Sequence, residues 1–239
     1  MAADPLIRAT GLAKIFGTTR VLNGVALDVH GGEAVALLGS NGAGKTTLLR
    51  ILATLSRPSK GTATIAGHDC VQDAEGVRRN IAFVAHGAHV YENLTALENL
   101  TFWMALGGGP TKRSALTGAL AAVELDAYAN ERVRTFSVGM KRRLAFAGLV
   151  LRRPRVLLLD EPSAGLDQRA WKWVEEHLRS FREAGGAVMM TTHSFGRGLD
   201  VADRIAILAG GRIVYDAARA GLGPVELQRL YAMHTEEPA

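Results

Sequence analysis

A chain of 239 residues with 48% hydrophobic and 21% charged side chains can form one large globular domain or two small ones, which excludes disorder as its main state. Its longest apolar runs, such as residues 156–159, are far shorter than the roughly 20 residues needed to cross a bilayer, so we expect no membrane span. The formal charge of +5 gives weak support for an anionic partner, which the charge leaves open as a nucleotide, a nucleic acid or the inner leaflet of a membrane.

Two local features indicate the cellular compartment. The first residues, Met1 to Pro5, lack a basic stretch followed by an apolar one, so we expect no secretory signal and a cytoplasmic location. The single cysteine, Cys70, excludes an internal disulfide framework and a cysteine metal cluster, and we expect it to be a buried thiol.

The first part of the chain is typical of short strands. We expect strands over residues 6–16, 21–29 and 33–38. The last of these is apolar without alternation, which predicts a strand buried on both faces of a parallel or mixed sheet. A helix is expected over 46–55, after a glycine-rich loop, and Pro58 follows its end.

The middle of the chain changes to a helical pattern, over residues 93–151. Thr95 and Glu98 have the spacing of a capping box at the start of a first helix, and further helices are expected over 114–123 and 140–151. The later elements are expected to be strands and helices again: a strand over 155–159, a helix over 168–182, strands over 187–191 and 204–208, and a short helix after Ala220 that contains Glu226, Gln228 and Arg229.

This order predicts a single α/β domain with an embedded helical subdomain. The β/α core would comprise residues 1–92 and 152–220, the helical subdomain 93–151, and a C-terminal tail 221–239, whose last four residues are expected to be frayed.

The strongest motif is a glycine-rich loop between an expected strand and an expected helix. It reads G-x-x-x-x-G-K-[ST], the phosphate-binding loop (P-loop) pattern. Its backbone N–H groups can surround a phosphate, Lys45 can reach the β- and γ-phosphates of a nucleotide, and the Thr46 hydroxyl can bind Mg²⁺. The predicted ATP-binding residues of this loop are Gly39, Ser40, Asn41, Gly42, Ala43, Gly44, Lys45, Thr46 and Thr47.

A second motif supplies acidic and basic groups for hydrolysis. The apolar strand at 156–159 runs into Asp160 and Glu161, whose side chains diverge at a strand end and can take different roles. Asp160 is predicted to hold Mg²⁺, and Glu161 to orient or deprotonate the attacking water. His193 follows another expected strand and would reach the same phosphates if the three strands are neighbours. Glu161, His193 and Lys45 are therefore the predicted catalytic residues.

Two further segments separate this sequence from other P-loop proteins. Residues 136–140 read FSVGM and residues 163–167 read SAGLD, and these resemble the signature motif and the D-loop of ATP-binding-cassette (ABC) transporter subunits. The resemblance extends from about residue 6 to residue 215. It implies a P-loop ATPase fold with a RecA-like core in a mixed sheet, an N-terminal antiparallel β subdomain and an inserted helical subdomain, and it implies ATP and Mg²⁺ as cofactors.

The same resemblance implies partners and a location. Two such subunits pair head to tail, so Ser137, Val138, Gly139 and Met140 of one chain would contact the nucleotide bound by the P-loop of a second copy, with Asp167 in the D-loop. Phe16 occupies the position of the aromatic residue that stacks on adenine. Integral membrane transporter subunits are the implied partners, no nucleic acid is expected, and the chain would lie peripherally on the cytoplasmic face of a bacterial inner membrane.

Two positions depart from the usual pattern of the family. Val138 replaces the second glycine of the signature, as in a subset of exporter subunits, and His86 stands where the Q-loop has glutamine. Neutral imidazole is a poor ligand for a hard cation, so a Mg²⁺ role for His86 is in doubt, whereas a role in coupling to the membrane subunit is open. With Tyr91, Phe102 and Trp103, this segment is similar to ATP-binding subunits of heme exporters of bacterial cytochrome c maturation.

Other interpretations stay open at this point. The cargo of the exporter could equally be a drug, a lipid or a polysaccharide, because docking residues identify a membrane partner rather than a cargo. A soluble ABC ATPase that acts on nucleic acid or ribosomes, and a P-loop kinase, fit less well. Phe102 and Trp103 could instead be core residues of the helical subdomain, and Lys141, Arg142 and Arg143 are expected to be solvated or phosphate-adjacent charges.

Overall fold

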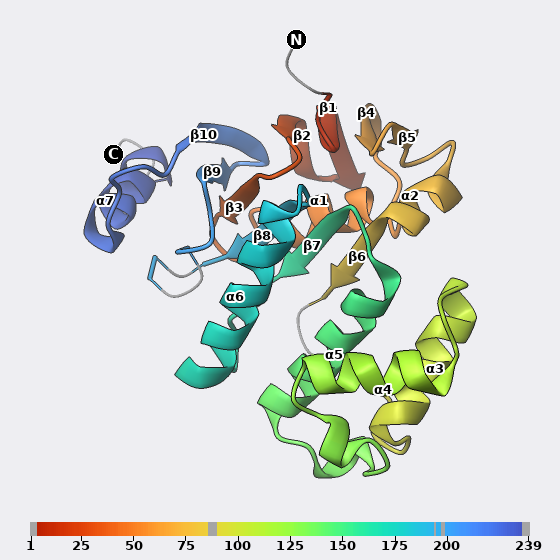
Figure 1. The fold of residues 1–239 in the computed structure, drawn as a ribbon. Helices are drawn as coiled ribbons and strands as arrows, with labels where there is room; N and C mark the ends of the chain where they lie inside the picture. The colour runs from red at the N-terminus through yellow and green to blue at the C-terminus, as the bar shows by residue number, and fades with distance from the viewer. Residues whose placement is uncertain (1–3, 86–89, 194, 197–198, 236–239) are drawn as a thin grey trace.

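The computed structural model describes residues 4–85, 90–193, 195–196 and 199–235 (Figure 1). A four-stranded antiparallel sheet, in the order β2-β1-β4-β5, forms the N-terminal part. Its strands are β1 (Ile7–Phe16), β2 (Thr19–Val29), β4 (Lys60–Ile65) and β5 (His68–Asp69).

A six-stranded sheet, in the order β10-β9-β3-β8-β7-β6, forms the centre of the molecule. Neighbouring strands run parallel except for β10, which is antiparallel to β9. The strands are β3 (Ala34–Leu38), β6 (Ile81–Val84), β7 (Val156–Asp160), β8 (Ala187–Thr192), β9 (Arg204–Ala209) and β10 (Arg212–Ala218).

The central strand β3 explains how the two halves of the core are divided. All five of its residues are buried, as its non-alternating sequence predicts. Because successive side chains of a strand point to opposite faces, Val35 and Leu37 pack with β1, β2 and α1, whereas Ala36 and Leu38 pack with the helices on the other face. Both faces of the sheet are therefore covered, which is typical of parallel sheets.

The helices occupy distinct places around this sheet. Helices α3, α4 and α5 lie together below it, α6 crosses the face of β7 and β8, and α7 lies beside β9 and β10 (Figure 1). The helices are α1 (Lys45–Leu52), α2 (Ala74–Asn80), α3 (Ala96–Gly107), α4 (Arg113–Ala122), α5 (Val138–Arg152), α6 (Gln168–Glu183) and α7 (Pro224–Thr235). In the part of the chain that the structure describes, none of these helices is long and apolar enough to cross a membrane.

Capping residues explain where the helices of the middle region begin. The predicted capping box is present, since Thr95 N donates to Glu98 Oε2 at 2.8 Å and Glu98 N donates to Thr95 Oγ1 at 3.1 Å. Helix α5 begins two residues earlier than the sequence predicts, because the Ser137 hydroxyl accepts a hydrogen bond from Met140 N and caps it.

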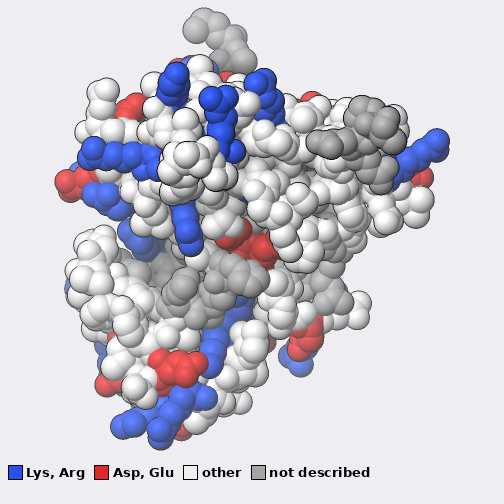
Figure 2. Space-filling model, turned by 180° about the vertical axis from the view of Figure 1, so that it is seen from behind, with Lys and Arg blue, Asp and Glu red and all other residues white. Residues whose placement is uncertain are grey.

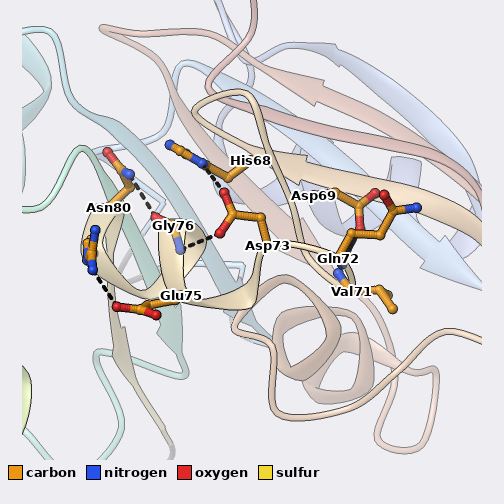
Figure 3. Close-up of polar contacts among 9 residues, drawn as sticks. His68, Asp69, Val71, Gln72, Asp73, Glu75, Gly76 and Asn80 are labelled. Atoms are coloured by element: carbon orange, nitrogen blue, oxygen red, sulfur yellow. Dashed lines mark hydrogen bonds and ion pairs between the residues drawn. The ribbon is translucent and has the colours of Figure 1, made fainter.

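Several elements were not predicted from the sequence: β4, β5, α2, β6 and β10. Figure 3 shows why α2 begins where it does: Asp73 Oδ1 accepts the N–H of Gly76 at 2.9 Å, while Asp73 Oδ2 lies 2.6 Å from His68 Nδ1. Helix α1 ends at Leu52 rather than at residue 55. Cys70 is buried as predicted, and burial raises the pKa of its thiol to about 12.

Candidate functional site

The glycine-rich loop lies between β3 and α1, at the carboxyl end of the central sheet. Gly44 precedes α1 with φ +107°, and a Cβ at this position would lie 2.8 Å from Leu22 Cδ2, so only glycine fits. No side chain caps α1, and no acidic side chain lies in its first turn. Its first-turn N–H groups, which have no acceptor within the helix, are therefore oriented to bind an anion.

Lys45 lies inside this loop. The residue is only 7% exposed, and its Nζ donates to the carbonyl oxygens of Gly39 at 2.7 Å and Ser40 at 3.1 Å. Burial lowers the pKa of Lys45, and the nearby carboxylates of Glu161 and Asp160 partly oppose this shift. The ammonium group is thus held beside the loop N–H groups, where it can bind phosphate oxygens.

Asp160, at the end of β7, links the neighbouring strand β8 and helix α1 in one hydrogen-bond network. Its Oδ2 accepts from Thr46 Oγ1 at 2.9 Å and its Oδ1 accepts from Thr191 Oγ1 at 2.6 Å. This arrangement follows from the strand order, because β8 lies between β3 and β7 and pairs Thr191 with Asp160. Thr191 was missed by sequence reasoning, although a hydroxyl at the end of an apolar strand was the available signal.

Glu161 and His193 lie next to this network. His193 Nδ1 is 2.9 Å from Glu161 Oε1, and the Glu161 side chain is 13% exposed while that of His193 is 62% exposed. The Glu161 N–H donates to Thr191 Oγ1 at 3.1 Å, and its backbone has φ +52°, the left-handed region that non-glycine residues rarely adopt. The structure therefore holds the Glu161 carboxylate beside the glycine-rich loop.

The residues around Asp160 fit a magnesium ion. A carboxylate and a hydroxyl, from Asp160 and Thr46, are hard oxygen ligands of the kind that Mg²⁺ binds. Among the described residues no group of three or more His, Cys, Asp or Glu side chains could hold a metal ion alone. The site therefore suits an ion that also takes oxygens from phosphates and water.

We use the name P-loop cleft for the cavity of about 590 Å³ that these groups surround. It is lined by Val21, Ser40, Asn41, Gly42, Gly44, Lys45, Thr46, Thr47, Asp160, Glu161 and His193. Val21, on β2, was not predicted. Phe16 does not line this cleft: it is 52% exposed, with Lys14 Nζ 4.7 Å from its ring centroid, so its contact with adenine stays a prediction. His86 lies outside the described residues.

The signature and D-loop residues lie elsewhere in the same chain. Ser137, Gly139, Met140 and Asp167 line a separate depression of about 540 Å³, which we call the signature face. Val138 is 61% exposed beside it. Within one chain the structure does not bring these residues to the P-loop cleft, which is the separation that a site shared with a second chain requires.

Basic residues at the start of α5 differ from the expectation. Lys141 pairs with Glu92 and Arg143 with Glu124, but Arg142 is only 3% exposed, so the prediction of a solvated charge is wrong for Arg142. Its guanidinium points to the ends of β6 and β7, because that side of α5 faces the sheet. Elsewhere, basic side chains on the rear face stand in several groups with acidic ones among them (Figure 2).

Tyr91, Phe102 and Trp103, the aromatic residues of the segment that resembles heme-exporter subunits, are divided between core and surface. Trp103 is partly buried against the helical core, as the core interpretation predicts. Tyr91 and Phe102 are 50% and 39% exposed and form an edge-to-face pair with ring centroids 4.9 Å apart. An exposed aromatic pair is thus available for a partner on this side of α3.

A family model described as ABC transporter matches residues 22–164, which cover the P-loop, the signature and the Asp160–Glu161 pair. The chain belongs to the ABC transporter family. It is 38% identical over 221 residues to the daunorubicin/doxorubicin resistance ATP-binding protein DrrA of Streptomyces peucetius, a match that covers 90% of this chain. The chain spans 66% of the length of that relative, or about two thirds.

Two solved structures support the family fold. The ATP-binding subunit of an ABC transporter matches with a TM-score of 0.86 and 27% identity, over 97% of this chain and all of the other. The ATP-binding cassette MJ0796, solved as a dimer in a post-hydrolysis state with ADP and Pi, matches with a TM-score of 0.78 and 25% identity, over 90% of this chain and all of the other. The predicted fold, a P-loop ABC ATPase with an antiparallel β subdomain and a helical region, is confirmed, and the chain is an ATPase of this family.

Proposed function

We propose that this chain is the ATP-hydrolysing subunit of a bacterial exporter, and that it acts as a homodimer docked peripherally on integral membrane subunits at the cytoplasmic face of the inner membrane. The observation that carries the proposal is the P-loop cleft, where adjacent strands bring Lys45, Thr46, Asp160, Glu161 and His193 together. These are the groups that ATP hydrolysis needs in one place.

Binding of ATP begins at the loop. The N–H groups before and within the first turn of α1 bind the phosphates, and Lys45 exchanges the carbonyls of Gly39 and Ser40 for phosphate oxygens. Thr46 and Asp160 are the residues that would hold Mg²⁺, which, when bound, offsets the negative charge of the phosphates.

Glu161 then acts on the attacking water. Its carboxylate accepts a proton of the water as the water oxygen bonds to the γ-phosphorus and the bond from that phosphorus to the β–γ bridging oxygen breaks, with ADP as the leaving group. His193 keeps the carboxylate oriented through Oε1. The hydrogen bonds from Thr191 Oγ1 to Asp160 and from the Glu161 N–H to Thr191 Oγ1 hold both acidic residues in place.

The second half of each site would come from a second copy. Ser137 caps α5 and lies with Gly139 on the signature face, where neither contacts the P-loop cleft of its own chain. In a head-to-tail pair these residues would bind the γ-phosphate held by the partner. ATP would then join the two chains, and its hydrolysis would release them.

For the cargo, we propose an organic molecule of the drug, lipid or polysaccharide class. The support is the 38% identity to a relative named for resistance to daunorubicin and doxorubicin. The narrower prediction of heme export for cytochrome c maturation rests on His86 and the Tyr91–Trp103 segment. The names of the relatives favour the drug-type exporter instead.

A Glu161→Gln substitution tests the catalytic part of the proposal. We expect ATP hydrolysis to fall by roughly 100-fold or more, since a general base is lost, while ATP binding persists. With ATP and Mg²⁺, the variant should elute as a dimer in size-exclusion chromatography. Glu183→Gln, which changes an exposed glutamate at the end of α6, should behave as wild type. An E161Q chain that hydrolyses ATP normally would refute the role of Glu161, and one that stays monomeric with ATP bound would refute the shared site.

Co-purification tests the cargo. The tagged chain is isolated from native membranes in mild detergent, its partners are identified by mass spectrometry, and the complex is scanned for heme absorbance. We expect a multi-span permease without heme. Recovery of cytochrome c maturation subunits with heme would establish the narrower heme prediction, and recovery of ribosomes or nucleic acid would overturn the transporter proposal.

A further inference from the structure

Arg142 is a buried charge outside the P-loop cleft, on the second turn of α5. Its side chain is 3% exposed, and its Nε is buried without a hydrogen-bond partner among the described residues. Burying a guanidinium with an unpaired donor costs stability, so a purely structural position would favour an apolar side chain of similar length. The carboxylate of Asp160 is the charge that stabilises it.

The two terminal nitrogens of Arg142 contact main-chain oxygens at the ends of two neighbouring strands. Nη2 donates to Glu161 O at 2.8 Å, and Nη1 donates to Ala85 O at 3.4 Å. Strands β6 and β7 are paired, with Val84 opposite Leu159, so Ala85 and Glu161 leave the sheet side by side. The rigid planar guanidinium is suited to bridge two acceptors in this way.

The contact with Glu161 completes a clamp on a strained residue. Glu161 has φ +52°. This conformation costs free energy for a residue with a Cβ and persists only where the surrounding structure holds it. The N–H of Glu161 donates to Thr191 Oγ1, and its carbonyl oxygen accepts from Arg142 Nη2 and, in a main-chain turn, from Ala164 N at 3.1 Å. Arg142 is the group that ties this turn to α5. Both backbone polar groups that define this conformation are therefore held by side chains from different elements.

We propose that Arg142 is a positioning residue, which holds the main chain of Glu161 so that its carboxylate faces the attacking water, and which makes this geometry depend on the placement of α5. Ser137 and Gly139 begin the same helix, so movement of the signature face would reach Glu161 through one side chain. The inference rests on the proposed role of Glu161 in hydrolysis.

Arg142→Met tests this inference, because methionine is of similar length and has no charge to desolvate. We expect kcat for ATP hydrolysis to fall by about 10- to 100-fold, as small misplacements of reacting groups cost this much, while KM for ATP stays within about twofold. Arg142→Lys keeps the positive charge but loses the planar guanidinium that bridges two acceptors, so it should give an intermediate kcat. This variant tests the inference if the methionine variant does not fold. Arg179→Met, which removes an exposed arginine from α6, should match wild type.

A double-mutant cycle separates positioning from a structural role. In the Glu161→Gln background, Arg142→Met should lower the residual rate by less than about twofold, since the two residues act through one carboxylate. An equal loss in both backgrounds, a kcat within about twofold of wild type, or a raised KM with normal kcat would overturn the inference. If the wild-type chain itself fails to hydrolyse ATP, the proposed function fails instead, so the two failures are distinguishable.

Discussion

The P-loop cleft and the signature face differ in how their polar groups are satisfied. In the cleft, Lys45, Asp160 and Glu161 are bound by partners from the glycine-rich loop, helix α1 and strand β8 of the same chain. On the signature face, the side chains of Ser137 and Asp167 accept helix-capping hydrogen bonds from Met140 N and Ala170 N. Val138, next to Ser137 in the chain, is 61% exposed. The P-loop cleft is therefore preorganised within one chain, whereas the signature face is an exposed surface.

This difference indicates where each region gains its function. The cleft is built by the fold itself, because parallel strands deliver its side chains to one edge of the sheet. Under the proposed function, the signature face acts only when a second chain covers it. Substitutions in the cleft should therefore act within one chain, whereas those on the signature face should act on a partner.

Mixing two inactive variants is the strongest test of this comparison. Lys45→Met removes the phosphate-binding ammonium, and Gly139→Asp places a negative charge where a γ-phosphate would bind. A Cβ at Gly139 would lie 3.5 Å from Ala170 Cβ, an ordinary contact, so this variant should fold. Each variant alone should lose roughly 100-fold or more in ATP hydrolysis. A 1:1 mixture should regain about a quarter of wild-type activity, since half of the dimers would carry one intact site.

The control for this mixture combines two variants of the same region. Lys45→Met with Glu161→Gln should regain nothing, because every P-loop cleft in the mixed dimers would then be defective. Recovery in this control, or none in the first mixture, would show that the two regions do not form shared sites as proposed.

Thr191→Val tests how far the cleft depends on its internal network. The hydroxyl is fully buried, and its loss leaves Asp160 Oδ1 and the Glu161 N–H without this partner. We expect a loss of about 1–3 kcal/mol in the free energy of unfolding, measured in urea, together with a lower kcat. Thr117→Val, on α4, removes a half-buried hydroxyl that donates to main-chain oxygens of its own helix, and it should change neither quantity. Equal stability of the Thr191 and Thr117 variants would contradict the preorganised cleft.

Phe16→Ala should have a smaller effect, on nucleotide affinity alone. If its exposed ring stacks on adenine, removing it should weaken ATP binding by about 1–3 kcal/mol in calorimetry, with stability nearly unchanged. Phe16→Tyr keeps the ring and should bind as wild type. Phe102→Ala removes an exposed ring far along the chain and is the matched control. An unaltered Kd for ATP in the Phe16→Ala variant would end the adenine assignment.

Most residues that line the cleft could be named from the sequence because their signals are local. The spacing of the loop glycines, Lys45 and Thr46, and the acidic pair after an apolar strand, depend on a few adjacent residues. The prediction that His193 lies near the same phosphates required only that three strands be adjacent, and the structure shows β8 between β3 and β7.

What the sequence could not predict depends on packing between distant segments. Arg142 lies within a run of three basic residues, and only the placement of α5 against β6 and β7 shows that its side chain is buried. Strand β10 alternates between exposed and partly buried residues at the edge of the sheet, so its apolar signal is weak. The contact of Thr191 with Asp160 likewise arises from strand pairing.

Helix α2 lies outside both regions and gives the smallest expected effect. Its capping residue Asp73 has a pKa below its ordinary value, chiefly because of the hydrogen bond with His68 and also because of Gly76 N (Figure 3). A carboxylate with a depressed pKa in the folded state stabilises the fold fully above its unfolded pKa, and this contribution is lost as the pH falls through the folded value. Asp73→Asn keeps an acceptor for Gly76 N but loses the charge.

The difference in unfolding temperature between wild type and the Asp73→Asn variant should therefore be small at about pH 5 and should shrink below about pH 4. In a His68→Ala background the same difference should be smaller at every pH, because the leading cause of the pKa shift is gone. ATP hydrolysis should stay at the wild-type rate throughout. A difference that grows as the pH falls below about pH 4 would contradict the sign of the shift, and a loss of activity would place α2 in communication with the P-loop cleft.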